Sequence, residues 1–105
     1  MAEIPSEVID LIQNFINLVK KDIRIEKVIL FGSYAKGTYQ FDSDIDLAII
    51  SSDVTDRIAD MGKMFALTWK INTDIEPYPI NTEDYNNRAT PFIHEIARTG
   101  VPLYL

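Results

Sequence analysis

The fold is decided by residues 28–50, VILFGSYAKGTYQFDSDIDLAII. This stretch begins with an uninterrupted apolar run at 28–31, whose β-branched and aromatic residues predict a strand buried on both faces. The run ends at Gly32, which with Ser33 predicts a turn followed by a short helix. A glycine lets a ligand approach the backbone closely, and the amides of such a turn can donate to an anion. The sequence therefore predicts a phosphate site directly after the first strand.

A pair of aspartates opens the second strand of this stretch. Asp44 and Asp46 alternate with Ile45 and Leu47, and the run then continues as Ala-Ile-Ile. Alternate residues of a strand share one face, so the two carboxylates point the same way while the isoleucine and leucine enter the core. Like charges held this close raise one pKa unless a cation neutralises them, and oxygen ligands suit Mg²⁺ or Mn²⁺. We therefore predict a divalent metal site here.

Two other motifs begin with similar residues but do not fit. The alternating aspartates that start at Asp42 match the beginning of a calcium-binding EF-hand loop. That loop requires glycine at its sixth position and glutamate at its twelfth, where this chain has Leu47 and Asp53. Residues 32–38 begin like a Walker A loop, but the order Gly-Lys-Thr is replaced by Lys-Gly-Thr. Neither a calcium loop nor a P-loop is expected.

The composite of these features resembles the signature of the minimal nucleotidyltransferases in the DNA polymerase β superfamily. Its parts are Gly32-Ser33 after a buried strand, a loop that contains Ala35-Lys36-Gly37, and Asp44-Ile45-Asp46 on the next strand. The resemblance implies transfer of a nucleoside monophosphate, usually AMP from ATP, to an acceptor hydroxyl with loss of pyrophosphate. It also implies a small mixed β-sheet with helices packed against it, which is an α/β (α+β) architecture.

The resemblance also implies roles for individual residues. Asp44 and Asp46 would hold two Mg²⁺ or Mn²⁺ ions together with ATP, and a third carboxylate would complete the catalytic site. Nucleotide binding would involve Gly32, Ser33, Lys36 and Ser43. Of these, Gly32 and Ser33 would bind the β and γ phosphates, and Lys36 would lie near the triphosphate as a point charge.

Two residues compete for the position of the third carboxylate. Residues 71–80, INTDIEPYPI, predict a third strand in which Asp74 and Glu76 share one face. Relatives with a similar Glu-Pro ending to this strand favour Glu76 as the third catalytic and metal-binding acid. Asp74 stays an alternative, since a change of strand register would place it opposite the aspartate pair. The prolines Pro77 and Pro79 require the strand either to end there or to lie at a sheet edge.

The remaining chain predicts helices around this sheet. Residues 5–21 have apolar positions at helical spacing, and a second helix is expected from a cap at Ser52 or Asp53 to Trp69. We expect a short turn after Thr82, a helix at 90–100 and an edge strand at 101–105. The second helix is expected to face the core with one stripe, which consists of Val54, Ile58, Met61, Phe65 and Trp69.

The composition limits the classes of partner. The 105 residues predict one domain, 1–105, and the net charge of −6 disfavours nucleic acid and anionic membranes as partners. The chain has no cysteine, no recognisable leader and no stretch of membrane-spanning length, so we expect a soluble cytoplasmic protein.

The resemblance also suggests a protein partner. Minimal members of this type occur beside a HEPN (higher eukaryotes and prokaryotes nucleotide-binding) protein, forming a toxin–antitoxin pair in which a tyrosine of the toxin is adenylylated. The alternative is a non-catalytic antitoxin module that binds a nucleotide or covers its partner, and homo-oligomerisation stays open. Three aromatic residues lie in the loop between the two halves of the motif, and they would stack on a base, anchor the loop or form the contact edge with a partner. They are Tyr34, Tyr39 and Phe41.

Overall fold

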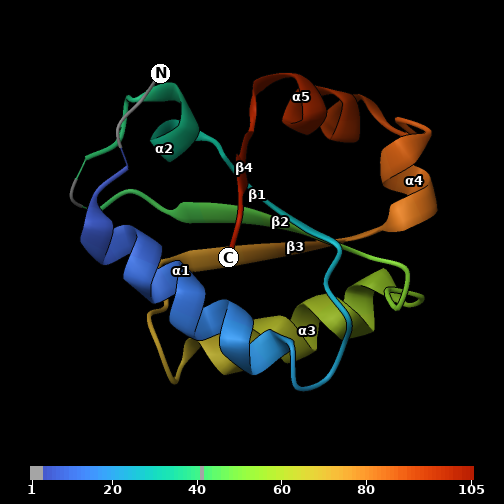
Figure 1. The fold of residues 1–105 in the computed structure, drawn as a ribbon, viewed down its shortest axis with the longest axis horizontal. Coiled ribbons are helices and arrows are strands. Elements are labelled where there is room, and N and C mark those ends of the chain that lie inside the picture. The colour runs from blue at the N-terminus through green and yellow to red at the C-terminus, as the bar shows by residue number, and fades with distance from the viewer. Residues whose placement is uncertain (1–3, 41) are drawn as a thin grey trace.

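We describe residues 4–40 and 42–105 in a computed structural model (Figure 1). Phe41, one of the three loop aromatics, lies outside the described residues. The elements in chain order are α1 (Ser6–Val19), β1 (Lys27–Phe31), α2 (Ser33–Lys36), β2 (Ile45–Ser51), α3 (Arg57–Thr68), β3 (Ile75–Asn81), α4 (Thr82–Asn86), α5 (Pro91–Thr99) and β4 (Val101–Leu103). The predicted succession of helices and strands is thus confirmed, except that the helix α4 stands where a short turn was expected.

The four strands form one mixed sheet in the order β3-β2-β1-β4. β1 runs antiparallel to β2 and β4, whereas β2 and β3 are parallel. The carboxyl end of β1 therefore meets the amino ends of β2 and β3 at one end of the sheet. In this register Phe31 lies opposite Asp46, and Asp46 lies opposite Glu76.

Helices cover both faces of the sheet, as Figure 1 shows. On one face α1 and α3 pack over a core that contains Phe15, Leu30, Leu47 and Ile75. On the other face α4 and α5 pack over a smaller core around Ile50. The central strands are therefore apolar on both faces, which explains their continuous hydrophobic runs. No helix in residues 4–40 and 42–105 has the length and apolar character needed to span a bilayer.

The proline-containing strand β3 lies at the sheet edge. This was one of the two expected alternatives, the other being that the strand ends at the prolines. β3 continues through both prolines to Asn81 and pairs only with β2 within the described sheet. Proline has no N–H, so only Glu76, Tyr78 and Ile80 can donate from β3 to β2 over this stretch. Pro77 and Pro79 then fall where a backbone N–H would have faced away from the sheet. The prolines are tolerated because they remove donors on the open side only.

The expected core face of α3 was wrong. The helix begins at Arg57 with Asp56 as its N-cap, so neither Ser52 nor Asp53 caps it and Val54 is buried in the preceding loop. Ile58 is 87% exposed and Trp69 81% exposed, whereas the buried positions of the helix are Met64 and Thr68. The helix carries two apolar stripes, and periodicity alone cannot choose between them. The stripe that packs contains methionine, whose flexible side chain fits an irregular gap.

The exposure of Trp69 leads to a simple spectroscopic prediction. Because this is the only tryptophan of the chain and the residue is 81% exposed, the native protein is expected to emit like indole in water. Acrylamide is expected to quench the native and urea-unfolded proteins to nearly the same extent. A blue-shifted native emission that acrylamide hardly quenches would contradict the orientation of α3, or would show that another molecule covers this stripe.

Candidate active site

Acidic side chains gather at the sheet end where β1 stops and β2 and β3 begin. Asp46 and Glu76 are register partners, so their side chains stand beside each other on the sheet face covered by α5. Asp44 precedes β2 by one residue, is exposed and lies close enough to Glu76 for the negative charge of Glu76 to raise the pKa of Asp44. The structure thus brings together the two predicted aspartates and one of the two candidates for the third acid.

The crowded charges raise the pKa of both aspartates. Burial, followed by contact with Glu76, raises the pKa of Asp46 to about 6, with a further contribution from Asp44. The negative charge of Glu76 is the largest cause that raises the pKa of Asp44, before its partial desolvation. Every cause that acts on the pKa of Asp46 raises it. This end of the sheet therefore favours taking up a proton or a cation.

The register distinguishes Glu76 from Asp74. The negative charge of Glu76 raises the pKa of both Asp44 and Asp46. The negative charge of Asp74 acts instead on Tyr34, whose pKa is raised first by burial and then by Asp74. The Asp74 carbonyl accepts a hydrogen bond from the Ile45 amide at 2.8 Å, which starts the pairing of β3 with β2. Asp74 thus contributes its backbone to the sheet, and Glu76 contributes its side chain to the carboxylate group.

Gly32 lies directly against Asp46. A Cβ at Gly32 would lie 2.3 Å from Oδ2 of Asp46 and 3.3 Å from its Cγ. The backbone there has φ 75° and ψ −147°, a conformation essentially restricted to glycine. The turn after β1 is therefore a glycine for two independent reasons, and its backbone comes into contact with the carboxylate.

The other predicted nucleotide-binding residues lie around this turn or in the loop before β2. Ser33 begins α2 and Lys36 ends it, and the exposed Lys36 shares a shallow hollow of about 90 Å³ with Gly32 and residues of α5. The hydroxyl of Ser43 accepts a hydrogen bond from the Gln40 amide at 2.7 Å, so this side chain closes the loop.

The predicted aromatic loop is a structural anchor. Tyr34 is only 5% exposed and its ring stacks on Tyr39, with centroids 4.5 Å apart and planes at 13°. Both residues belong to the core under α1 and α3. Of the three expected roles, anchoring is confirmed, and the idea that Tyr34 provides a contact edge was wrong because its ring is buried.

A second group of aromatic residues lies behind the carboxylates, and sequence analysis missed it. Tyr78 donates a hydrogen bond to Oε2 of Glu76 at 3.2 Å, and burial followed by the charge of Glu76 raises the pKa of Tyr78 to about 12. Its ring meets Phe31 at 5.2 Å and Phe92 at 5.6 Å between centroids. The two-residue alternation that pairs Glu76 with Tyr78 would have revealed the tyrosine, but nothing local points to Phe92 on α5.

The carboxylates fit a divalent metal ion by chemistry and charge. They provide oxygen ligands only, and a cation would relieve the repulsion that raises the pKa of Asp44 and of Asp46. Over the ranges 4–40 and 42–105, however, no three acidic, histidine or cysteine side chains already surround one point as metal ligands. Mg²⁺ often completes its shell with substrate phosphates and water rather than with protein ligands alone.

Comparison with known proteins agrees with the geometry. A family model described as "Polymerase beta, Nucleotidyltransferase" matches residues 13–105. MJ0141 of Methanocaldococcus jannaschii, whose name marks it as a candidate protein adenylyltransferase, is 32% identical over 100 residues, or 90% of this chain and 97% of that protein. MntA of Shewanella oneidensis, named a protein adenylyltransferase, is 28% identical over 90 residues, or 85% of this chain and 61% of MntA.

Solved structures share the fold. A crystal structure of a candidate nucleotidyltransferase from Sulfolobus solfataricus matches with a TM-score of 0.68 and 18% identity, over 93% of this chain and 80% of that one. A variant of the MntA–HpeT toxin–antitoxin complex matches with a TM-score of 0.60 and 25% identity, over 88% of this chain and 70% of that one.

The mixed sheet and its acidic end define a protein of the nucleotidyltransferase class. The chain belongs to the polymerase beta nucleotidyltransferase family, whose model covers most of its length. A further relative, MJ0604 of M. jannaschii, is 44% identical over 52 residues, which are 48% of this chain and 52% of that protein. The match therefore spans about half of MJ0604 and 61% of MntA, but nearly all of MJ0141.

The contact between Gly32 and Asp46 predicts a large difference between two glycine substitutions. Gly32→Ala is expected to lower the free energy of unfolding by about 1–3 kcal/mol, because it forces an unfavourable φ and drives a methyl group into the Asp46 carboxylate. Urea unfolding at neutral pH provides the measurement.

Gly62→Ala is the matched control, because Gly62 lies within α3 and a Cβ there meets nothing within 4 Å. This substitution is expected to raise the free energy of unfolding by about 0.5–1 kcal/mol through helix propensity. Equal effects of the two substitutions would show that Gly32 is not constrained by Asp46.

Proposed function

We propose that this chain transfers AMP from ATP to a hydroxyl group on a partner protein. The observation that carries the proposal is the group of carboxylates at the sheet end, held against the glycine turn that follows β1. The match with relatives that are named protein adenylyltransferases supports the choice of AMP and of a protein acceptor.

Asp44, Asp46 and Glu76 are the proposed metal-binding and catalytic residues. These side chains would hold two Mg²⁺ or Mn²⁺ ions, which when bound would neutralise the charge that develops during transfer. The acceptor oxygen forms a bond to the α-phosphorus while the bond from that phosphorus to the bridging oxygen of pyrophosphate breaks. Glu76 accepts the proton of the acceptor hydroxyl, because its carboxylate stands on β3, on the far side of Asp46 from Gly32.

The triphosphate is proposed to lie over the turn after β1. Gly32 presents backbone with no side chain in the way, and Ser33 follows it at the start of α2. The exposed ammonium group of Lys36 lines the same hollow as Gly32 and would contribute a positive charge. Ser43, whose hydroxyl already bonds the Gln40 amide, would act by shaping the loop next to Asp44.

The proposed acceptor is a tyrosine of a HEPN-type toxin. MntA is a named protein adenylyltransferase, and a solved structure of this fold at 25% identity is an MntA–HpeT toxin–antitoxin complex. The net charge of −6 favours a partner with a basic face over a polynucleotide. A purely binding antitoxin is the second candidate, and the crowded carboxylates argue against it because steric cover alone would not need them.

Labelling with ATP carrying phosphorus-32 at the α position tests the proposal. With Mg²⁺ and the protein encoded by the neighbouring reading frame, label is expected on that protein, on tyrosine, and not in the presence of EDTA. Asp46→Asn and Glu76→Gln are expected to reduce labelling at least 100-fold, because each removes a metal ligand or the base.

Asp74→Asn is the matched control on the same strand, and a reduction of less than tenfold is expected because the charge of Asp74 acts away from the carboxylates. If Asp74→Asn abolished labelling and Glu76→Gln did not, the third acid would be Asp74. If the partner bound tightly but carried no label with any divalent metal, catalysis would be excluded and the chain would be a purely binding antitoxin.

A further inference from the structure

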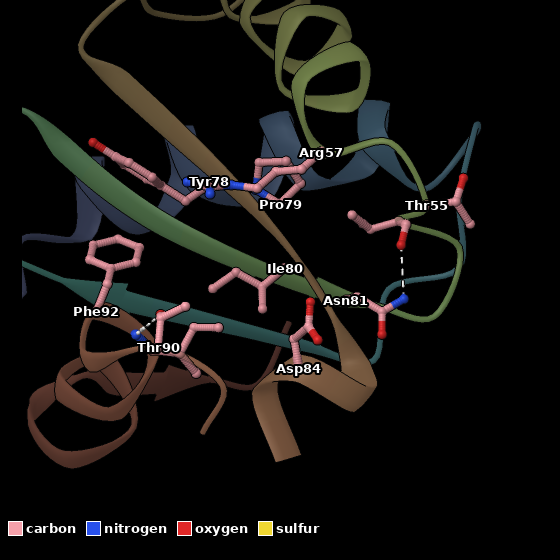
Figure 2. A pocket seen from close by; sticks show the side chains of 11 residues that line it. Thr55, Arg57, Tyr78, Pro79, Ile80, Asn81, Asp84, Thr90 and Phe92 are labelled. Atoms are coloured by element: carbon pink, nitrogen blue, oxygen red, sulfur yellow. Dashed lines mark hydrogen bonds between the residues drawn. The ribbon is translucent and has the colours of Figure 1, made fainter. Parts of the chain in front are cut away.

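A cavity of about 150 Å³ lies along β3 next to the carboxylates, between this edge strand, the start of α3 and the α4–α5 hairpin (Figure 2). Tyr78, Ile80 and Phe92 supply much of its apolar wall, whereas Thr55, Arg57 and Asp84 stand around it. An apolar cavity of roughly this volume accommodates one benzene ring. The space is therefore suited to a single side chain or a small ring.

Part of the polar lining is already engaged in structural hydrogen bonds. Asn81 donates to the Val54 carbonyl at 2.8 Å and accepts from the Glu83 amide at 2.9 Å, and Thr90 accepts from the Ile93 amide at 3.1 Å as the N-cap of α5. These groups hold the walls together. The remaining polar residues of the lining, Thr55, Arg57 and Asp84, are exposed, whereas Ile80 and Ile93 are buried in its apolar wall, so the cavity favours an apolar occupant.

The position of the cavity relative to the carboxylates indicates its place in the reaction. Gly32 and Lys36 lie on the β1 side of Asp46, and Glu76 lies on the β3 side. Attacking and leaving oxygens are roughly in line during phosphoryl transfer. With the pyrophosphate over the β1 side, the acceptor approaches from β3. Tyr78 connects the two regions, because its ring lines the cavity and its hydroxyl bonds Glu76.

The edge of β3 cannot bind an acceptor segment by ordinary strand addition. Pro77 and Pro79 remove the outward backbone donors of this edge, so an added strand would lack half of its ladder. A segment that crosses this edge must therefore be held mainly by side chains, and the cavity is the place that can accept one.

We propose that this cavity anchors one apolar side chain, aromatic or branched aliphatic, from the partner segment that carries the acceptor hydroxyl. The inference rests on the proposed function. The cavity extends along β3 from Tyr78 to Asn81, and a strand rises about 3.3 Å per residue. The anchor residue is therefore expected about two to four positions from the acceptor residue in an extended segment.

Nuclear magnetic resonance of the 105-residue chain tests the binding site without any transfer reaction. The probe is p-cresol, the side-chain analogue of tyrosine. It is expected to shift the backbone amides of Tyr78, Ile80 and Asp84, and to do so equally when Mg²⁺ and AMP-PNP are present. Thr55→Phe, an exposed position at the cavity, is expected to weaken p-cresol binding at least tenfold. Asn14→Phe, exposed on α1, is the matched control and should leave the affinity for p-cresol unchanged.

The labelling assay then links the cavity to the acceptor. Thr55→Phe is expected to raise the KM for the partner protein at least tenfold while the Kd for ATP stays within twofold. An unchanged KM would overturn the anchor, as would amides that p-cresol does not shift. Shifts of the same amides by adenosine, with displacement of p-cresol, would make the cavity a nucleobase site. Failure of the proposed function appears differently, as a wild-type chain that labels no partner.

Discussion

The main constraint on this structure is the crowding of negative charge at one end of a small sheet. Asp46 and Glu76 are register partners on adjacent parallel strands, and Asp44 is close enough for Glu76 to raise its pKa. Such an arrangement is unfavourable for the isolated domain, since the neighbouring charges disfavour ionisation of Asp44 and of Asp46. The arrangement persists because a hydrophobic core packs on each face of the sheet and fixes the strands that carry these carboxylates. Strain of this kind is expected at a functional site.

The same end of the sheet determines which residues are tolerated around it. Gly32 has no side chain because Asp46 occupies the space, and its φ of 75° turns the chain into α2. Pro77 follows Glu76 without harm because β3 is an edge strand whose outward donors are dispensable. Tyr78 donates to Glu76 and, with Phe31 and Phe92, separates the carboxylates from the rest of the face under α5. The chemistry is thus confined to the sheet end and the edge beside it.

Residues that are close in sequence were predictable, and those brought together by helix packing were not. The aspartate pair follows from the two-residue period of a strand, whereas the register that places Glu76 opposite Asp46 is visible only in the folded sheet. The stripe on α3 was misassigned because Ile58 and Trp69 are as periodic as Met64, and only the packed structure shows which side is buried. The cavity joins Arg57, Tyr78 and Phe92 from three elements, so no local pattern could indicate it.

The central claim is that Asp46 is held ionised against its neighbours at neutral pH, and the pH dependence of folding tests it directly. With a folded pKa of about 6, above the ordinary value of 3.8, the contribution of Asp46 to stability is fully present below about pH 4 and is lost as the pH rises through 6. Urea unfolding in EDTA would compare wild type, Asp46→Asn and Asp10→Asn, the last being an exposed α1 position with the same change of net charge. We predict that Asp46→Asn gains stability over wild type between pH 4 and 7.5, and by more than Asp10→Asn does. If the free energy of unfolding of Asp46→Asn differed from that of the wild type by the same amount at pH 4 and at pH 7.5, the raised pKa of Asp46 would be wrong.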